Sequence, residues 1–175
     1  MRRLQFFVTA GLLLFCVPIL ANSASAMAVP APGCTTNQLD VLASNWFGAA
    51  GNGSMAFDLV NRGARCRIGG YPTVKFQNGS GIAVDWHDIH RSSMLFAEPK
   101  AVTVTLTHGS VATFGVSWAD NPVNNQTCLV TANALVELSH GVGNFWGLVP
   151  INPEPCGRTL WVTPIEPGAW PRPNG

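Results

Sequence analysis

The chain carries few charged residues and no long run of either sign. Of its 175 residues 11% are charged, with 10 Lys and Arg against 9 Asp and Glu. Proteins that bind nucleic acid cluster Lys and Arg on one surface, and disordered chains are rich in Lys, Glu and other polar residues. The sequence has neither pattern, so we expect a folded domain with no nucleic-acid partner.

The sequence also lacks the common catalytic motifs. It has no Gly-x-Ser-x-Gly elbow, no His-Glu-x-x-His pair, no P-loop and no dinucleotide fingerprint. No two of its carboxylates form an obvious acid/base pair. We therefore predict that the protein is not an enzyme, and we assign it no catalytic residue and no cofactor.

No segment repeats its apolar residues with a helical period, and apolar and polar residues alternate instead. The pattern is clearest in residues 102–107 and 112–118, which a short turn at His108-Gly109-Ser110 joins into a predicted β-hairpin. The 13 Pro and 18 Gly are spread along the chain, as expected for short strands joined by turns. We predict an all-β fold, an antiparallel Ig-like β-sandwich of about seven to nine strands.

The sequence predicts one domain and a tail. We place the β-sandwich at residues 34–164 and an extended Pro-rich tail at residues 165–175. Within the domain, four stretches without alternation are predicted to be loops: residues 48–54, 87–100, 119–127 and 139–155.

Residues 1–26 resemble a secretory signal peptide. Two arginines precede an uncharged apolar run at residues 6–20, and Ala24-Ser25-Ala26 fits the small-x-small rule for cleavage. We expect cleavage after Ala26, or after Ala28. The alternative is an uncleaved anchor, but the run is shorter than the roughly 20 residues that span a membrane. We predict a secreted or cell-envelope protein with no transmembrane helix after cleavage.

Lipidation is not expected at Cys16, because the bulky Phe15 precedes it where a lipoprotein has a small residue. Cleavage leaves four cysteines, and an even number in an exported chain predicts disulfides. Three pairings are possible. We predict Cys34–Cys66 and Cys128–Cys156, which close loops of about 30 residues worth about 3–4 kcal/mol each. A four-thiolate zinc site would need a Cys-x-x-Cys pair that the sequence lacks.

Two blocks of sequence resemble a known family. The first contains Gly48-Ala49-Ala50-Gly51-Asn52, Asn61 and Cys66-x-Ile68-x-Gly70-Tyr71-Pro72. The second contains Leu106-x-x-Gly109-x-x-Ala112, Trp118, Cys128, Cys156-Gly157 and Val162-Thr163-Pro164. Together they resemble a domain of unknown function in exported actinobacterial proteins, some of them lipid-anchored. The resemblance implies a β-sandwich with two disulfides in or outside the cell envelope, and it brings no activity with it.

One segment has the composition of a metal site. Zinc and copper bind imidazole and carboxylate groups, and the possible ligands are Asp85, His87, Asp88 and His90, with His108 or His140 as a more distant third partner. The simpler interpretation is a solvated strand end, and we predict no bound metal.

The aromatic residues give the remaining candidates. Of six Trp, Trp86 and Trp118 share the alternation of apolar neighbours and are predicted to be in the core. Trp161 alternates against its apolar neighbours, and Trp146 lies among glycines. Exposed aromatic rings can stack on sugars or anchor a partner, so Trp161 and Trp146 are candidate binding residues, unless loops or the tail cover them. Tyr71 is predicted to be a buried corner residue whose hydroxyl bonds to the backbone.

These observations predict an exported, non-catalytic binding or structural module whose ligand the sequence does not identify. The candidate partners are an envelope protein, a glycan or a lipid. The alternative function is a metal-dependent or hydrolytic secreted enzyme that uses His87 and His90.

Overall fold

The computed structural model describes residues 29–44, 46–84, 86–91, 96, 100–122, 126–138 and 145–170. The predicted signal peptide, Asp85 and His140 lie outside these residues. Apart from one short 3-10 helix, η1 (Thr36–Gln38), the regular elements of the described residues are strands. The all-β class predicted from the alternation is therefore confirmed.

The strands follow one another along the whole described chain. They are β1 (Leu39–Ala43), β2 (Phe47–Ala49), β3 (Asn52–Asn61), β4 (Cys66–Gly69), β5 (Thr73–Gln77), β6 (His87–His90), β7 (Thr103–Leu106), β8 (Val111–Ala119), β9 (Asn133–Leu138), β10 (Phe145–Pro150), β11 (Cys156–Val162) and β12 (Glu166–Pro167).

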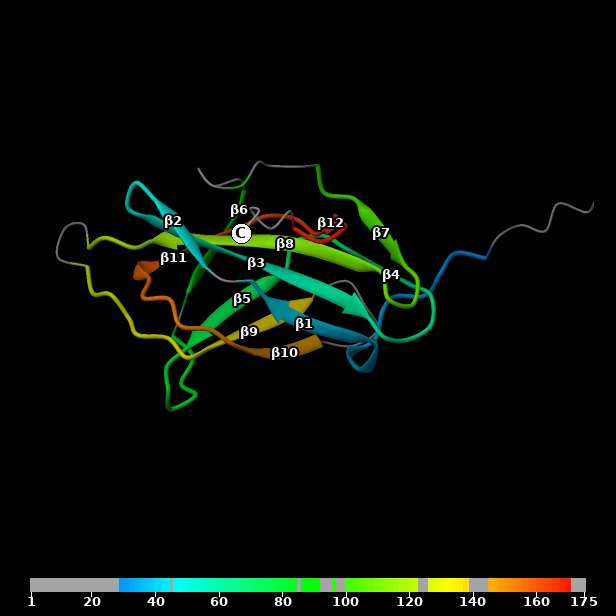
Figure 1. Ribbon diagram of the computed structural model, residues 1–175, viewed down its shortest axis with the longest axis horizontal. Coiled ribbons are helices and arrows are strands. Elements are labelled where there is room, and N and C mark those ends of the chain that lie inside the picture. The colour runs from blue at the N-terminus through cyan, green and yellow to red at the C-terminus, as the bar shows by residue number, and fades with distance from the viewer. Residues whose placement is uncertain are drawn as a thin grey trace, which may run out of the picture.

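The strands form a large sheet, a smaller sheet and a two-stranded ribbon (Figure 1). The large sheet has the order β1-β3-β8-β11-β6, with β2 added beside β3 and β12 beside β8. The smaller sheet has the order β10-β9-β5, and the ribbon pairs β4 with β7. The large and smaller sheets share one hydrophobic core, and the strand pairings are antiparallel except that of β11 with β6. This arrangement is compatible with the predicted Ig-like sandwich.

The core lies between β3 and β8 on one side and β5 and β9 on the other. Phe57 and Phe114 stack with their ring centroids 5.1 Å apart, and Trp118 packs edge-on against Phe76 at 5.6 Å. Each such side chain contributes about 1.5–3 kcal/mol when fully buried. Trp86 and Trp118 are both buried, as their place in the alternation predicts.

The predicted hairpin of residues 102–118 is wrong in its pairing. Both strands exist, but β7 pairs with β4, and β8 pairs with β3 and β11. The predicted turn is present, since the Ser110 amide donates to the Thr107 carbonyl at 3.0 Å. It connects β7 of the ribbon to β8 of the large sheet. Alternation shows which residues face the core, and it does not show which strand lies alongside.

Asn61 holds this turn in place. Its backbone amide donates to the Ser110 carbonyl at 3.0 Å, and its carbonyl accepts from the Gly109 amide at 2.7 Å. Its buried side chain donates to the carbonyls of Leu106 and Ala64 and accepts from the Gly63 amide. One residue therefore joins the end of β3 to the chain on both sides of the turn.

Three of the predicted loops contain strands. Residues 48–54 form the tight hairpin of β2 and β3, in which Ala50 (φ 52°) and Gly51 (φ 81°) make a two-residue turn. Residues 87–90 form β6, and residues 145–150 form β10. These strands were not predicted because they lack a clear alternation of apolar and polar residues. The sequence of β6 is His-Asp-Ile-His, and glycines interrupt the β2–β3 hairpin and β10.

The described part of the predicted tail belongs to the large sheet. β12 pairs with β8, and the Gly168 amide donates to the Val111 carbonyl at 2.8 Å. Ile165 is buried in the core. The Trp170 ring packs edge-on against Phe96 at 4.5 Å, and a Cβ at Gly115 would touch that same Phe96 ring. Phe96 and Trp170 thus lie over the outer face of β8 at Gly115.

The predicted disulfide pairing is confirmed. Cys34 is bonded to Cys66, and Cys128 is bonded to Cys156. The first bond fixes the segment before β1 to the ribbon, and the second fixes the segment before β9 to the start of β11. Two disulfides indicate an oxidising, extracytoplasmic environment. No helix in the described residues is long and apolar enough to cross a membrane.

Candidate functional site

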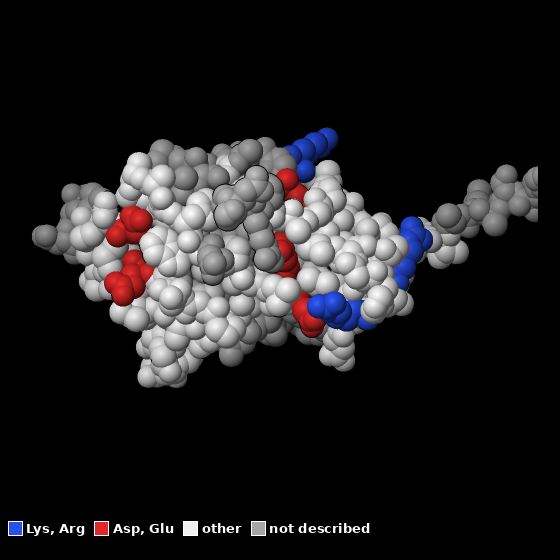
Figure 2. Space-filling view, viewed as in Figure 1, with Lys and Arg blue, Asp and Glu red and all other residues white. Residues whose placement is uncertain are grey.

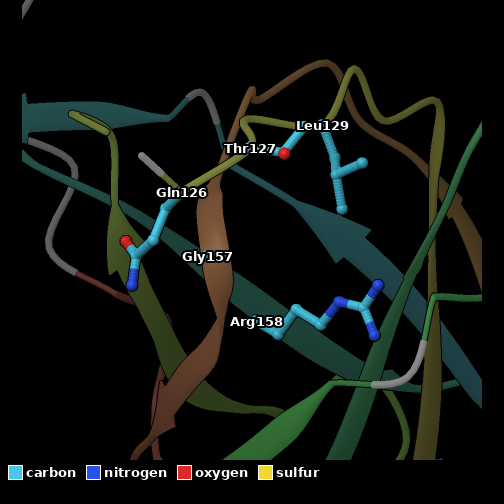
Figure 3. A pocket seen from close by; sticks show the side chains of 5 residues that line it. All are labelled: Gln126, Thr127, Leu129, Gly157 and Arg158. Atoms are coloured by element: carbon cyan, nitrogen blue, oxygen red, sulfur yellow. The ribbon is translucent and has the colours of Figure 1, made fainter. Parts of the chain in front are cut away.

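A depression of about 400 Å³ lies where the Cys128–Cys156 disulfide joins β11 (Figure 3). It is lined by Gln126, Thr127, Leu129, Gly157 and Arg158. These residues come from two segments that are far apart in the chain. The disulfide and two backbone hydrogen bonds, from Leu129 to Pro155 and from Gly157 to Thr127, hold the segments together.

The start of β11, beside this depression, pairs irregularly with β8. Its pairing with β8 shifts register between Cys156 and Trp161, and Gly157 has a positive φ of 72°. A Cβ at Gly157 would lie 3.0 Å from Gln126 Oε1, so the glycine lets the Gln126 side chain rest against the strand.

Arg158 is the charged residue of the depression. Its side chain is exposed, and the ion pair found among the described residues, Arg62 with Asp40 at 2.7 Å, does not involve it. Figure 3 shows its guanidinium below the Leu129 side chain, with Gln126 on the opposite side of β11. A guanidinium binds a carboxylate or phosphate with two parallel hydrogen bonds. The lining therefore suits the binding of an anionic group beside a small apolar one.

Charge is sparse on the surface around the large sheet. Figure 2 shows a face that is mostly uncharged, with Lys, Arg, Asp and Glu in a few separate groups. Arg158 takes part in no ion pair among the described residues, so its guanidinium remains available to attract an anion.

A second hollow, of about 280 Å³, lies beside Trp46. Trp46 is 48% exposed, a large fraction for a tryptophan. Sequence reasoning did not single out Trp46, because it stands one residue before the three-residue strand β2, which is too short to show alternation. The sequence feature that could have identified Trp46 is its position in Trp46-Phe47-Gly48, at the start of a Gly-rich hairpin.

The predicted metal ligands are described in part. His87, Asp88 and His90 lie on β6, whereas Asp85 and His140 are outside the described residues. Residues three apart on a strand point to opposite faces, so His87 and His90 do not converge. No group of three or more His, Cys, Asp or Glu in the described residues could hold an ion. Because Asp85 and His140 lie outside the described residues, the absence of a bound metal stays a prediction.

Asp88 joins the two sheets. Its Oδ2 accepts a hydrogen bond from the Val74 amide of β5 at 3.0 Å, and its buried Oδ1 has no hydrogen-bond partner among the described residues. Burial raises the pKa of Asp88 above its ordinary value of 3.8, and the Val74 hydrogen bond and the charges of His90, Lys75 and His87 oppose that rise. We interpret Asp88 as a structural link.

Comparison with known protein families places most of this structure in one of them. The sequence model of a domain of unknown function, DUF4232, matches residues 34–165. The chain belongs to the DUF4232 family. No curated protein and no solved structure matches it. The DUF4232 domain begins at Cys34, so it contains both disulfides, the Arg158 depression and Trp46, while β12 and Trp170 follow its last matched residue.

The predicted binding tryptophans occupy different places in the DUF4232 domain. Trp161 is half-buried on the outer face of β11, between Ser117 of β8 and Ile89 of β6, and its two neighbours Leu160 and Val162 are fully buried. This agrees with the alternation used to predict its direction. The backbone of Trp146 lies in β10, and its side chain is outside the described part. A binding role for either residue stays a prediction.

Tyr71 differs from its predicted corner role. Its side chain is half-buried, and its ring stacks on the His90 imidazole with centroids 4.7 Å apart and planes 9° apart. Like Asp88, this contact lies where β6 of the large sheet meets the chain that leads into β5. The Tyr71-Pro72 motif of the DUF4232 domain thus supports the edge of the sandwich.

Replacing Asp88 with asparagine should change how stability depends on pH. Because the folded domain binds the Asp88 proton more tightly than the unfolded chain, the free energy of unfolding falls as pH rises above 3.8 towards the raised pKa. The asparagine side chain removes this loss and can still accept from the Val74 amide. Melting curves of wild type and Asp88→Asn between about pH 3.5 and 7 test this. The melting temperature of the variant should rise relative to that of the wild type as the pH rises. If the difference between the two melting temperatures does not change with pH, the raised pKa of Asp88 is contradicted.

Proposed function

We propose that this DUF4232 domain is a non-catalytic binding module of the cell envelope or the extracellular space, and that the Arg158 depression binds the anionic group of its ligand. The observation that carries the proposal is the exposed Arg158 guanidinium, which has no ion-pair partner among the described residues. The disulfides support the extracytoplasmic location.

The lining supplies binding chemistry around that charge. Thr127 offers a hydroxyl and Leu129 offers an apolar surface, while Gln126, on the other side of β11, offers an amide that both donates and accepts. A concave site with an apolar part and a few placed polar groups is the usual form of a small-ligand pocket. The ligand that fits is a small carboxylate or phosphate ester with an apolar portion.

The site is held rigidly, which favours binding. Thr127 precedes Cys128, and Gly157 follows Cys156, so two lining residues adjoin the disulfide directly. The Gly157 amide also donates to the Thr127 carbonyl at 3.2 Å. A site that is ordered before binding loses less conformational entropy when the ligand arrives.

Substitution of Arg158 tests the proposal. The mature protein, wild type and Arg158→Gln, is titrated calorimetrically with a panel of succinate, hexanoate, glycerol phosphate and glucuronate. We expect at least one to bind to the wild type, with affinity that falls as salt is added. The variant should bind it at least about tenfold more weakly, since a charged hydrogen bond contributes about 1.5–3 kcal/mol.

Arg65→Gln is the matched control, because Arg65 is also exposed but lies just before β4. It should bind the anions as the wild type does. The proposal fails if no anion of the panel binds, or if the Arg158 and Arg65 variants bind equally well.

A further inference from the structure

We propose that the hollow at Trp46 is a second binding site, which takes one uncharged sugar ring of a glycan. It is separate from the anion site at Arg158 and shares no lining residue with it. Its walls come from both sheets. β1, Trp46 and β3 form one wall, and the chain from Pro150 to Asn152 forms the other.

The indole is fixed in an exposed position. A Cβ at Gly48 would lie 3.3 Å from Trp46 Cζ3, so the ring rests against the backbone of β2 on one side. The residue is nevertheless 48% exposed. An exposed aromatic ring held from behind is a platform for the apolar face of a pyranose.

The remaining lining matches the rest of a sugar. Met55 and Ile151 are buried and form an apolar base, while Asn152 is exposed and offers an amide that donates and accepts hydrogen bonds. Sugar hydroxyls also donate and accept. None of the residues that line this hollow is ionisable, so its chemistry favours an uncharged ligand.

A neighbouring carboxylate adds a preference against acidic glycans. A Cβ atom added at Gly48 would lie 3.3 Å from Asp120 Oδ2 and also 3.3 Å from Trp46 Cζ3. The Asp120 carboxylate and the Trp46 ring therefore lie close to the same point on β2. It would repel a uronic acid or a phosphate. The two sites therefore prefer ligands of different charge. The Arg158 guanidinium attracts anions to the first site, and the Asp120 carboxylate repels them from the second.

Size and rigidity fit a single ring. At about 280 Å³ the hollow is slightly smaller than pockets for drug-sized ligands, which begin at about 300 Å³. Both walls are tied to the sheets. The Ser44 amide donates to the Ala56 carbonyl at 2.8 Å, and the Ile151 amide donates to the Ala132 carbonyl at 3.0 Å.

Binding to defined polysaccharides tests the inference. The mature protein is run by affinity electrophoresis through gels that contain a soluble neutral glucan, mannan or galactan, or the acidic polygalacturonate. We expect retardation by at least one neutral polymer and none by the acidic one. Trp46→Ala should weaken binding at least tenfold, and Asn152→Ala several-fold. Because Trp46 is exposed, its variant should keep the wild-type melting temperature, and Trp46→Leu serves if the alanine variant is unstable.

Two control variants show whether sugar binding depends on this hollow in particular. Ile82→Ala removes another exposed apolar side chain, 62% accessible, and should leave binding unchanged. Arg158→Gln should also leave it unchanged, so failure of the anion site and failure of the sugar site are distinguishable. The inference is overturned if no neutral polymer retards the protein, if only polygalacturonate does, or if both Trp46 variants bind like the wild type.

Discussion

Asn61→Ala is expected to lower the free energy of unfolding by about 3 kcal/mol. The Asn61 side chain is completely buried and makes three hydrogen bonds, to the carbonyls of Leu106 and Ala64 at 3.2 and 3.0 Å and from the Gly63 amide at 2.9 Å. Alanine cannot replace any of them. A buried polar group left without a partner costs about 1–3 kcal/mol, and the Leu106 carbonyl is in that position.

Asn78→Ala provides the matched control in urea denaturation. Asn78 Oδ1 also accepts from backbone amides, those of Ser80 and Ile82, each at 3.0 Å, but in an exposed turn. Water can replace those contacts, so the cost should stay below about 1 kcal/mol. Equal losses for the two variants would show that the corner at Asn61 does not depend on its side chain.

Removing the Cys128–Cys156 disulfide is the second change with a large expected effect. The bond closes a loop of 28 residues, and its replacement by two alanines should cost about 3 kcal/mol, within the 2–5 kcal/mol usual for small exported domains. Because Thr127 and Gly157 adjoin the bond, anion binding at Arg158 should weaken as well.

The other disulfide is the control for that second effect. Cys34–Cys66 closes a loop of similar length, 32 residues, so its replacement should cost a similar free energy in urea denaturation. It has no residue in the Arg158 depression, and anion affinity measured under folding conditions should be unchanged. If both double variants lose affinity equally, the disulfide does not order the binding site.

The sequence predicted the parts of the fold that depend on local pattern. Alternation located β8 and the buried Trp118, and the even cysteine count led to both disulfides. It did not predict that β7 pairs with β4, because strand pairing depends on contacts distant in sequence. β6 was missed because this edge strand carries polar residues in place of an apolar alternation.

The candidate sites were harder to predict than the fold. Arg158 was a lone cation in a strand, and the depression depends on the irregular start of β11 at Gly157 and on the packing of residues 126–129 against it. In the sequence, the His87 and His90 cluster resembled a metal site more closely than Arg158 resembled a binding site. Strand geometry, however, directs the two imidazoles to opposite faces of β6. Residues with reactive or metal-binding side chains form a site only where the backbone directs those side chains towards one another, even if they are adjacent in sequence.

The position of β11 and β12 beside β8 has a consequence for biosynthesis. β8 is an interior strand of the large sheet, yet its neighbours on one side, β11 and β12, are the last strands of the described domain to be synthesised. While the ribosome is still adding them, β8 has an open edge and the core lacks Leu160, Val162 and Ile165. The domain therefore cannot close around its core until both β11 and β12 have been synthesised.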